Sequence, residues 1–304
     1  MSEMPELSII IVNWNTRDLL DECIASVYST IKSTSFDVWV VDNASSDGSV
    51  EMVEAKYPQA NLIRNERNEG FGRANNRAIK ASEAACILLL NSDIVLTENT
   101  IDEAYRVFLK HPEFGALGCA LVGSDGKVQE SFSDRIPHGP SVCTEAPEGL
   151  ISSAYVWAAC MFLRRSVIDR VGMFDEDFMV FHEDTDLCWR MLDAGFKIAY
   201  APKLRILHGC RQSVKRLSRE TYLTWLFSAE YTLFRKHHSR GMTLFQMCKR
   251  YVYYSIRLLG HQLAFAFSKS EHQQEMGQWF GTARRLLPVM LNPAGLSEGG
   301  EHEV

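Results

Sequence analysis

The chain has 304 residues, of which 46% are hydrophobic and 11% aromatic, and its formal net charge is −6. This composition excludes an intrinsically disordered chain, because it supplies a large core for one big domain or for a domain with an appendage. No stretch holds about 18 uninterrupted apolar residues, and the N-terminus lacks a basic start before an apolar run, so we expect neither a membrane-spanning nor a secreted protein.

Strands and helices are predicted to alternate over the first hundred residues. Short apolar runs rich in β-branched residues, typical of buried strands, lie at 7–14, 36–43, 60–65 and 85–93. Helical periodicity is found at 16–30, 48–56, 70–81 and about 98–110. This alternation predicts an α/β fold with a mostly parallel sheet and right-handed crossovers.

Polar residues follow three of these predicted strands. The strand ends read Asn-Trp-Asn at 13–15, Asp-Asn at 42–43 and Asn-Ser-Asp at 91–93. Ligands of parallel sheets bind at the carboxyl ends of the strands, so these residues predict a binding site. For 91–93 a simple turn is the alternative, because Asn and Asp are common turn formers.

The second half of the chain changes character. The stretch 123–151 is rich in Gly, Ser and Pro without a clear period, and it predicts loops and short strands. Beyond it we expect a strand at 155–165, helices at 166–178 and 184–195, and strands at 196–202 and 204–208. From about Ser218 the pattern is helical and aromatic, and the end from Ala294 is expected to fray.

Two local motifs each have two interpretations. The segment 68–76 contains Gly-x-Gly, but a dinucleotide fingerprint belongs to the first βα turn and needs a third glycine where this chain has Asn75. Two interpretations of the motif remain. The glycines Gly70 and Gly72 either let a ligand approach the backbone at the start of a helix, or they allow tight packing of the helix without a ligand. The segment 181–190, FHEDTDLCWR, carries three carboxylates that either cap a helix or perform chemistry.

Six segments together resemble glycosyltransferase family 2, especially its bacterial rhamnosyltransferase-like members: LSIIIVNWN, VVDNASSDGS, NEGFGRANN, LLLNSD, the run from AACMFLRR to KIAYAP, and ILH. The order and spacing match over about residues 7–240. The resemblance implies a GT-A type Rossmann-like fold, a nucleotide-sugar donor, Mg²⁺ or Mn²⁺, and inversion at the anomeric carbon.

The resemblance also implies a donor site. By position, Asp42 would hold the base of the nucleotide, and Asn13 and Asn15 would line the same pocket. Trp157 stands beside two alanines and would offer an aromatic face to a sugar ring, with core packing as the alternative. The predicted donor-binding residues are Asn13, Asn15, Asp42, Gly72, Asn75, Asn91 and Trp157.

A metal pair and a general base are implied as well. Asp93, the last residue of the acid-x-acid motif, and His208 would bind the metal, although His208 could equally be an ordinary partly buried histidine. Asn91 occupies the first acidic position of the motif, where an amide is a weaker ligand, so metal affinity is lower or Asn91 serves the sugar. Asp184 would take the proton of the attacking hydroxyl, with Glu183 beside it as the second catalytic residue.

Charge divides the chain into two parts. Residues 1–204 hold 18 Lys/Arg and 31 Asp/Glu, a net of −13, whereas residues 205–304 hold 14 and 7, a net of +7. In the basic part the cations alternate with aromatic residues, which predicts surface helices lying on an anionic membrane. Packing of the aromatics as core is the alternative, and nucleic acid is not an expected partner.

The sequence therefore predicts a catalytic domain at 1–215, a basic-aromatic helical region at 216–293 and a disordered tail at 294–304. The expected activity moves a sugar, rhamnose or another hexose, from a dTDP- or UDP-sugar to a glycan or lipid-linked acceptor in cell-surface polysaccharide synthesis. Alternatives are a sugar nucleotidyltransferase and a non-catalytic glycan- or partner-binding relative. The eight cysteines occur singly, which suits the reducing cytoplasm. The basic-aromatic region predicts that the protein is peripheral on the cytoplasmic face of the membrane.

Overall fold

The computed structural model describes residues 4–136, 139–142, 146–147, 149–209 and 218–290. The chain divides into two compact units. The sheet unit comprises Met1–Met179 with Glu183–Lys215, and the helical unit comprises Val180–His182 with Arg216–Val304. The tail predicted at 294–304 lies outside the described residues.

A nine-stranded sheet forms the centre of the sheet unit. Its strand order is β3-β2-β1-β4-β10-β6-β11-β5, with β8 paired to β11. The strands are β1 (Leu7–Asn13), β2 (Phe36–Asp42), β3 (Asn61–Arg64), β4 (Cys86–Asn91), β5 (Ile94–Val95), β6 (Phe114–Val122), β8 (Ile151–Ser153), β10 (Cys160–Arg164) and β11 (Lys197–His208). Two short strands, β7 (Phe132–Ser133) and β9 (Tyr155–Val156), form a separate pair.

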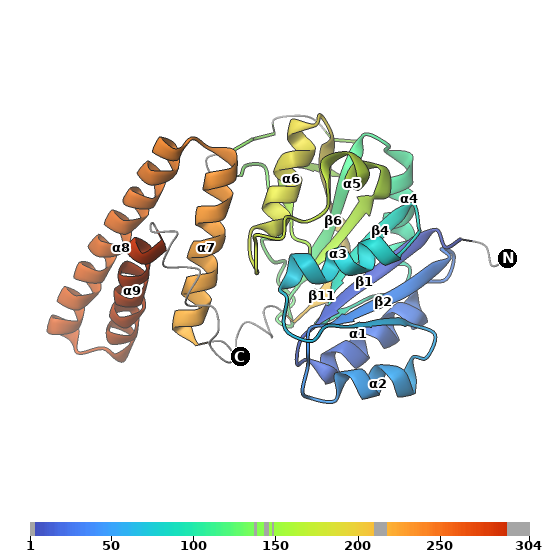
Figure 1. Ribbon diagram of the computed structural model, residues 1–304, viewed down its shortest axis with the longest axis horizontal. Coiled ribbons are helices and arrows are strands. Elements are labelled where there is room, and N and C mark those ends of the chain that lie inside the picture. The colour runs from blue at the N-terminus through green and yellow to red at the C-terminus, as the bar shows by residue number, and fades with distance from the viewer. Residues whose placement is uncertain (1–3, 137–138, 143–145, 148, 210–217, 291–304) are drawn as a thin grey trace. The chain divides into compact units, whose positions relative to one another are not determined.

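Helices cover both faces of this sheet (Figure 1). On one face lie α1 (Arg17–Thr30), α2 (Ser49–Lys56) and α4 (Thr100–Lys110), and on the other lie α3 (Phe71–Ala81), α5 (Arg165–Val171) and α6 (Glu183–Asp193). Alternate residues of β1 serve the two cores, since Ile9 and Ile11 pack with α1 while Ile10 packs with α3. A strand buried on both faces is almost continuously apolar, which explains this run, in which Ser8 is the one polar residue before Asn13.

The predicted α/β class is confirmed, and the sheet is mixed. Strands β1, β2, β3 and β4 are parallel neighbours, and β6 is parallel to β11. Strand β10 lies antiparallel between β4 and β6. The first four predicted strands and the four predicted helices before residue 111 agree with the structure to within about two residues at each end.

The structure differs from the sequence expectation in four places. The helix expected at 166–178 is the shorter α5, which ends at Val171 because Gly172 leaves the helical conformation at φ +86°. Strand β6 was not predicted, because its Gly115 and Gly118 lower the strand signal. Both glycines are needed for packing: a Cβ at Gly118 would lie 2.7 Å from the Cβ of Val156. The strand expected at 155–165 is divided by a turn at 157–159, and the two expected after residue 195 form the single strand β11, whose register shifts around Pro202.

The helical unit consists of α7 (Arg219–His237), α8 (Arg240–Ser268) and α9 (Glu271–Met290). Its core contains Phe227, Phe234 and Tyr254, so for these aromatics the alternative of core packing holds. The buried Glu230 forms an ion pair with Arg250, with 2.7 Å between Glu230 Oε1 and the guanidinium of Arg250. The predicted helical C-terminal region is confirmed, and none of the helices within the described ranges is long and apolar enough to cross a bilayer.

Candidate active site

The ends of β1 and β2 are joined by a buried hydrogen-bond network. Asn13 donates from Nδ2 to Asp42 Oδ1 (2.9 Å) and to Ser45 Oγ (3.1 Å). The other carboxylate oxygen, Asp42 Oδ2, accepts the backbone N–H of Ser45 (2.8 Å), and Ser45 Oγ also accepts the N–H of Asn15 (2.8 Å). The parallel pairing of Asn13 with Asp42 places both side chains at the carboxyl edge. The structure therefore brings together Asn13, Asn15 and Asp42.

A hydroxyl chain continues this network to the end of β4. Thr16 donates from Oγ1 to Asn13 Oδ1 (2.7 Å), and its oxygen lies 2.8 Å from Ser92 Oγ. Ser92 stands between Asn91, the last residue of β4, and Asp93. Three strand ends thus share one polar edge. Thr16 and Ser45 were not predicted as site residues, since single hydroxyls after a strand are common in turns.

Asp93 and His208 meet through backbone pairing. Strand β5 follows Asp93 directly, and its Ile94 is paired with His208 of β11. The N–H of Gly209 donates to the carbonyl of Asp93 (2.9 Å). As a result, His208 Nε2 lies 3.3 Å from Asp93 Oδ1, with both residues buried.

Gln129 fixes the tautomer of His208. Its Nε2 donates to the backbone carbonyl of His208 (3.1 Å), so its Oε1 faces His208 Nδ1 at 2.7 Å and can only accept the hydrogen there. The neutral imidazole then carries its lone pair on Nε2, for which the described residues offer no hydrogen-bond partner. A lone pair and a carboxylate oxygen that face each other at this distance fit two ligands of one cation. Gln129 was not predicted, because its stretch has no sequence period.

Two acidic residues begin α6 and differ in their surroundings. Glu183 is 6% exposed, and its Oε2 has no hydrogen-bond partner among the described residues. Burial, helped by the nearby charge of Asp184, raises the pKa of Glu183 to about 8. Asp184 is partly exposed. Burial also raises the pKa of Asp184. The N–H of Ala158 donates to its Oδ2 (3.3 Å) and the N–H of Thr185 to its Oδ1 (2.7 Å), and both hydrogen bonds favour the carboxylate form.

The turn between β9 and β10 connects the acid pair to the sheet edge. The N–H of Ala158 contacts Asp184, while the carbonyl of Ala159 accepts the N–H of Asn91 (3.0 Å). Trp157 begins this turn, and its half-buried ring packs against the core below α1 and α4. The turn thus places Asp184 close to the strand end that carries Asn91 and Asp93.

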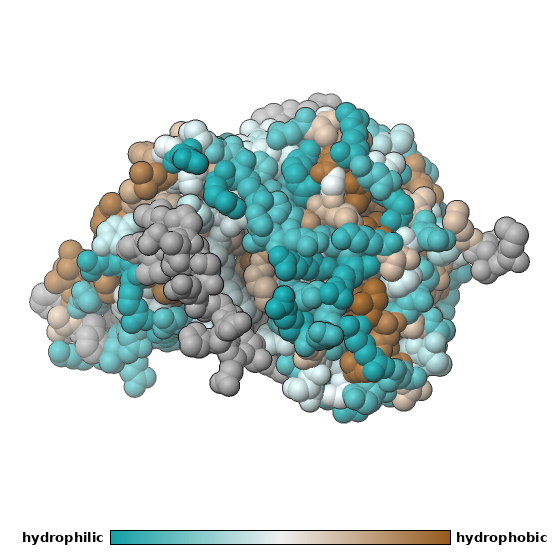
Figure 2. Space-filling model, viewed as in Figure 1, coloured by the Kyte–Doolittle hydropathy of each residue, from teal (hydrophilic) through white to brown (hydrophobic). Residues whose placement is uncertain are grey.

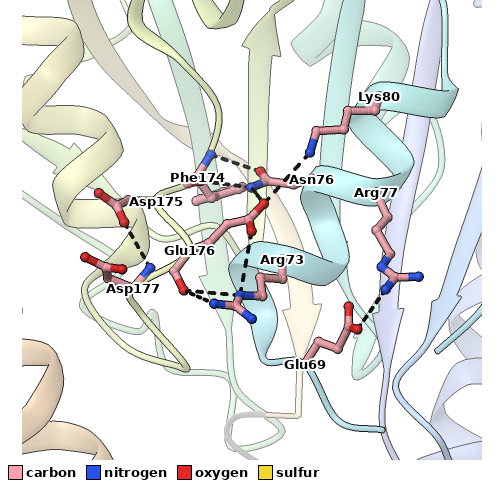
Figure 3. Close-up of polar contacts among 9 residues, drawn as sticks. All are labelled: Glu69, Arg73, Asn76, Arg77, Lys80, Phe174, Asp175, Glu176 and Asp177. Carbon is pink, nitrogen blue, oxygen red and sulfur yellow. Dashed lines mark hydrogen bonds and ion pairs between the residues drawn. The ribbon is translucent and has the colours of Figure 1, made fainter. Parts of the chain in front are cut away.

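Helix α3 holds the segment that precedes the acid pair (Figure 3). Asn76 donates to the carbonyl of Phe174 (2.8 Å) and accepts its N–H (3.0 Å), so one amide pairs with both backbone groups of one residue. The same Nδ2 contacts Glu176 Oε1 (3.1 Å), and Arg73 donates to the carbonyl of Glu176. Phe174 and Glu176 are therefore tied to α3 by the side chains of Arg73 and Asn76.

The two glycines of this motif permit the close approach. Gly70 has φ +86°, and a Cβ there would lie 2.3 Å from the carbonyl oxygen of Met179. A Cβ at Gly72 would lie 3.2 Å from Phe174 Cβ. Asn75 is buried, and its amide donates to the backbone carbonyl four residues earlier. Within the part of the chain that the structure describes, no hydrogen bond joins Gly72 or Asn75 to the network of the strand ends.

The raised pKa of Glu183 predicts a pH-dependent stability. Between its ordinary pKa of 4.5 and about 8, the folded chain keeps a proton that the unfolded chain releases. The free energy of unfolding therefore falls as pH rises through this interval. Because glutamine cannot release a proton, we expect Glu183→Gln to gain thermal stability relative to the wild type as pH rises from 5 toward 8. Melting temperatures at several pH values measure this, and a pH-independent difference would contradict it.

The sequence of this chain matches that of glycosyl transferase family 2 over residues 8–172, more than half of its length. An N-acetylglucosaminyl-diphospho-decaprenol L-rhamnosyltransferase of Mycobacterium tuberculosis is 26% identical over 259 residues, covering 74% of this chain and 84% of that protein. An O-antigen biosynthesis protein of Myxococcus xanthus is 28% identical over 223 residues, covering 67% of this chain and 17% of that protein.

Solved structures show the same fold. The mannosyltransferase PcManGT from Pyrobaculum calidifontis, in complex with GDP-Man and Mn²⁺, has a TM-score of 0.57 at 14% identity, covering 95% of this chain and 88% of that one. GalNAc-T7 with UDP, GalNAc and Mn²⁺ has a TM-score of 0.55 at 14% identity, covering 77% and 50%. The resemblance drawn from the sequence motifs is confirmed: the chain belongs to glycosyltransferase family 2 and is a glycosyltransferase of the GT-A fold.

Proposed function

We propose that this glycosyltransferase transfers rhamnose or another hexose, with inversion, from a dTDP- or UDP-sugar to a glycan or lipid-linked acceptor in cell-surface polysaccharide synthesis. One observation carries the proposal: the turn at 157–159 hydrogen-bonds both to Asp184 and to Asn91, two residues before Asp93. Asp93 in turn faces His208 in a pair suited to a metal ion. The similarity to a rhamnosyltransferase that uses a lipid-diphosphate acceptor supports the sugar and the acceptor class.

The donor is proposed to lie along the ends of β1, β2 and β4. Asp42 and Asn13 hold the nucleoside side through the buried network they share. Asn15 and Asn91 contribute amides at the same edge. Because Asn91 is uncharged, it would not repel the diphosphate as an aspartate at this position would. Gly72, Asn75 and Trp157 are also proposed donor contacts, on the basis of the sequence alone. Trp157 directly precedes Ala158, whose N–H donates to Asp184.

Asp93 and His208 are proposed to hold Mg²⁺ or Mn²⁺. The unpartnered Nε2 of His208 beside Asp93 Oδ1 fits such an ion. The described residues provide no group of three or more His, Cys, Asp or Glu ligands, which fits ions that take the rest of their shell from phosphates and water. When bound, the ion would neutralise the charge that develops on the leaving diphosphate.

Asp184 is proposed as the general base. Its partly exposed carboxylate removes the proton from the acceptor hydroxyl, whose oxygen forms the bond to the anomeric carbon as the bond to the nucleoside diphosphate breaks. Because burial raises the pKa of Glu183 to about 8, Glu183 keeps its own proton at neutral pH and adds no charge beside Asp184. The hydrogen bonds from Ala158 and Thr185 orient the carboxylate of Asp184.

A donor panel tests the proposal. Thermal stabilisation by dTDP- and UDP-sugars is measured with Mn²⁺ and with a chelator, because a ligand of the folded chain raises its melting temperature. The stabilising donor is then incubated with a lipid-linked acceptor. Release of nucleoside diphosphate with glycosylated acceptor supports transfer. Release of pyrophosphate would indicate a nucleotidyltransferase, and neither product would favour a binding protein.

Gln129 provides a further test of the metal pair. Without its amide, His208 can rotate and exchange tautomers, and loss of such a supporting hydrogen bond typically weakens metal binding about 10–100-fold. We expect Gln129→Ala to weaken Mn²⁺-dependent donor binding by this factor and to leave metal-free nucleotide binding unchanged. Titration calorimetry with and without Mn²⁺ measures both. Lys127→Ala, at an exposed neighbouring position, is the control. Equal weakening with and without metal would refute the role.

A further inference from the structure

Helix α8 is apolar on its solvent side. Seven large apolar residues along it are 44–65% exposed and form its outer face: Met242, Phe245, Val252, Tyr253, Ile256, Leu259 and Leu263. Figure 2 shows apolar surface recurring along this helix. Helical geometry at 100° per residue gathers all seven within an arc of about 120°, over a length of about 32 Å.

The opposite side of α8 is also apolar. Met247, Tyr254 and Leu258 are buried there against α7 and α9. A helix on the surface of a globular unit normally has one apolar stripe and a polar opposite face. Since the core already uses one side of α8, its outer face is apolar surface that folding of the helical unit does not cover. Contiguous exposed apolar surface of this kind marks an interaction site.

Charge distinguishes between the possible occupants of the outer face. Helix α8 contains Arg240, Lys249, Arg250 and Arg257, and its sequence contains no Asp or Glu. Glu230 of α7 pairs with Arg250, whereas Lys249 and Arg257 are exposed. Lys249 lies within the arc of the outer face itself. Two copies of α8 packed along this face would bring like charges together, but an anionic surface would complement them.

The spacing alone would also suit a second helix. Apart from Tyr253, successive residues of the outer face, with Lys249 included, lie three and four residues apart, as in a coiled-coil seam. A coiled coil gains its pairing specificity from opposite charges beside the seam. The positions beside the seam of α8 carry no charged residue: Gly241, Gln246, Cys248, Tyr253, Ser255, Gly260 and Gln262. The flanking residues therefore do not support self-association.

We propose that the outer face of α8 docks on a membrane surface that contains anionic lipid. The helix lies in the plane of the interface, with Phe245, Ile256 and Leu263 among the side chains that enter the acyl boundary, and with Lys249 at the level of the phosphates. This inference rests on the proposed function in one respect, since it identifies the surface on which a lipid-linked acceptor would be met.

Vesicle sedimentation tests the docking. The full chain is mixed with vesicles of phosphatidylcholine alone and of phosphatidylcholine with phosphatidylglycerol, at low and at high salt. We expect sedimentation with the anionic vesicles that weakens at high salt. The double variant Ile256→Glu/Leu263→Glu should lower this binding at least tenfold, because both substitutions place charge in the exposed arc that would enter the membrane. Leu244→Glu, exposed on the same helix but outside the arc, is the matched control and should bind as the wild type does.

Each other outcome overturns the proposal. Equal sedimentation with neutral and anionic vesicles, no sedimentation, or unchanged binding by the double variant would refute anionic docking through this face. A wild-type dimer in analytical ultracentrifugation that the double variant breaks, without vesicle binding, would assign the face to a second copy. Circular dichroism verifies that the double variant is folded, and Lys249→Gln gives a milder second variant that should lose part of the salt-sensitive binding.

Donor binding separates this proposal from the proposed function. Stabilisation by a nucleotide sugar with Mn²⁺ is measured on the same double variant. Loss of vesicle binding with donor stabilisation retained supports docking by α8 and leaves the transferase assignment intact. Absence of donor stabilisation in the wild type would overturn the donor assignment, whatever the vesicles show.

Discussion

Asp184→Asn is expected to fold, to bind the donor and to lose about two to four orders of magnitude in turnover, the range for a removed general base. Asparagine keeps the shape of the side chain and can still accept the 2.7 Å hydrogen bond from the N–H of Thr185. It gives up the longer contact with Ala158, at 3.3 Å, and it cannot take the acceptor proton. The effect should therefore fall on turnover and not on donor affinity.

The measurement is steady-state transfer at several pH values, with donor binding determined separately. In the wild type, turnover should fall on the acid side as the raised pKa of Asp184 is crossed, and Asp184→Asn should lose this limb of the profile. Glu183→Gln is the matched comparison, because glutamine resembles the protonated acid that Glu183 is at neutral pH. It should keep turnover within about tenfold. A larger loss in Glu183→Gln than in Asp184→Asn would assign the base to Glu183.

The second large effect concerns the metal pair. Chelation should abolish transfer, and Asp93→Ala and His208→Ala should each weaken Mn²⁺-dependent donor binding by more than the roughly 10–100-fold expected for a supporting residue. Because the two side chains would share one ion, the double variant should be little worse than either single variant. Donor binding without metal should change much less.

Calorimetric titrations of nucleoside diphosphate, with Mn²⁺ and with chelator, give all four values of this cycle. Lys127→Ala serves as the control outside the site. Transfer that survives chelation would contradict the metal assignment. Normal metal-dependent binding by His208→Ala would remove that residue from the pair while leaving Asp93 in place.

Sequence periodicity predicted the parallel half of the sheet because burial on both faces leaves a strong signal. Each residue of β1 except Val12 is buried, so the run is apolar apart from Ser8 and the end residue Asn13. The polar residues at the strand ends were recognisable for the complementary reason, since Asn13, Asp42 and Asn91 interrupt apolar runs abruptly. Local composition thus predicted both the edge and the side chains that gather there.

Other parts depended on partners far away in the chain. In strand β6, Gly118 makes room for Val156 and Gly115 for Val167, and nothing adjacent in sequence indicates these contacts. Gln129 acquires its role only through His208, 79 residues later. The contacts of Asn76 with Phe174 are likewise long-range, which is why a glycine-rich motif suggested a ligand rather than a tied segment.

The pairing of β11 with β5 has a consequence for how this site can vary. Side chains alternate between the faces of a strand, and Leu207, next to His208, is 46% exposed on the face opposite to Asp93. Removal of one residue between Arg205 and His208 would shift the register and turn the histidine to that outer face. Substitution of Ile206 or Leu207, by contrast, would leave the register unchanged and keep His208 beside Asp93. Related chains should accordingly tolerate substitutions here far more readily than insertions or deletions.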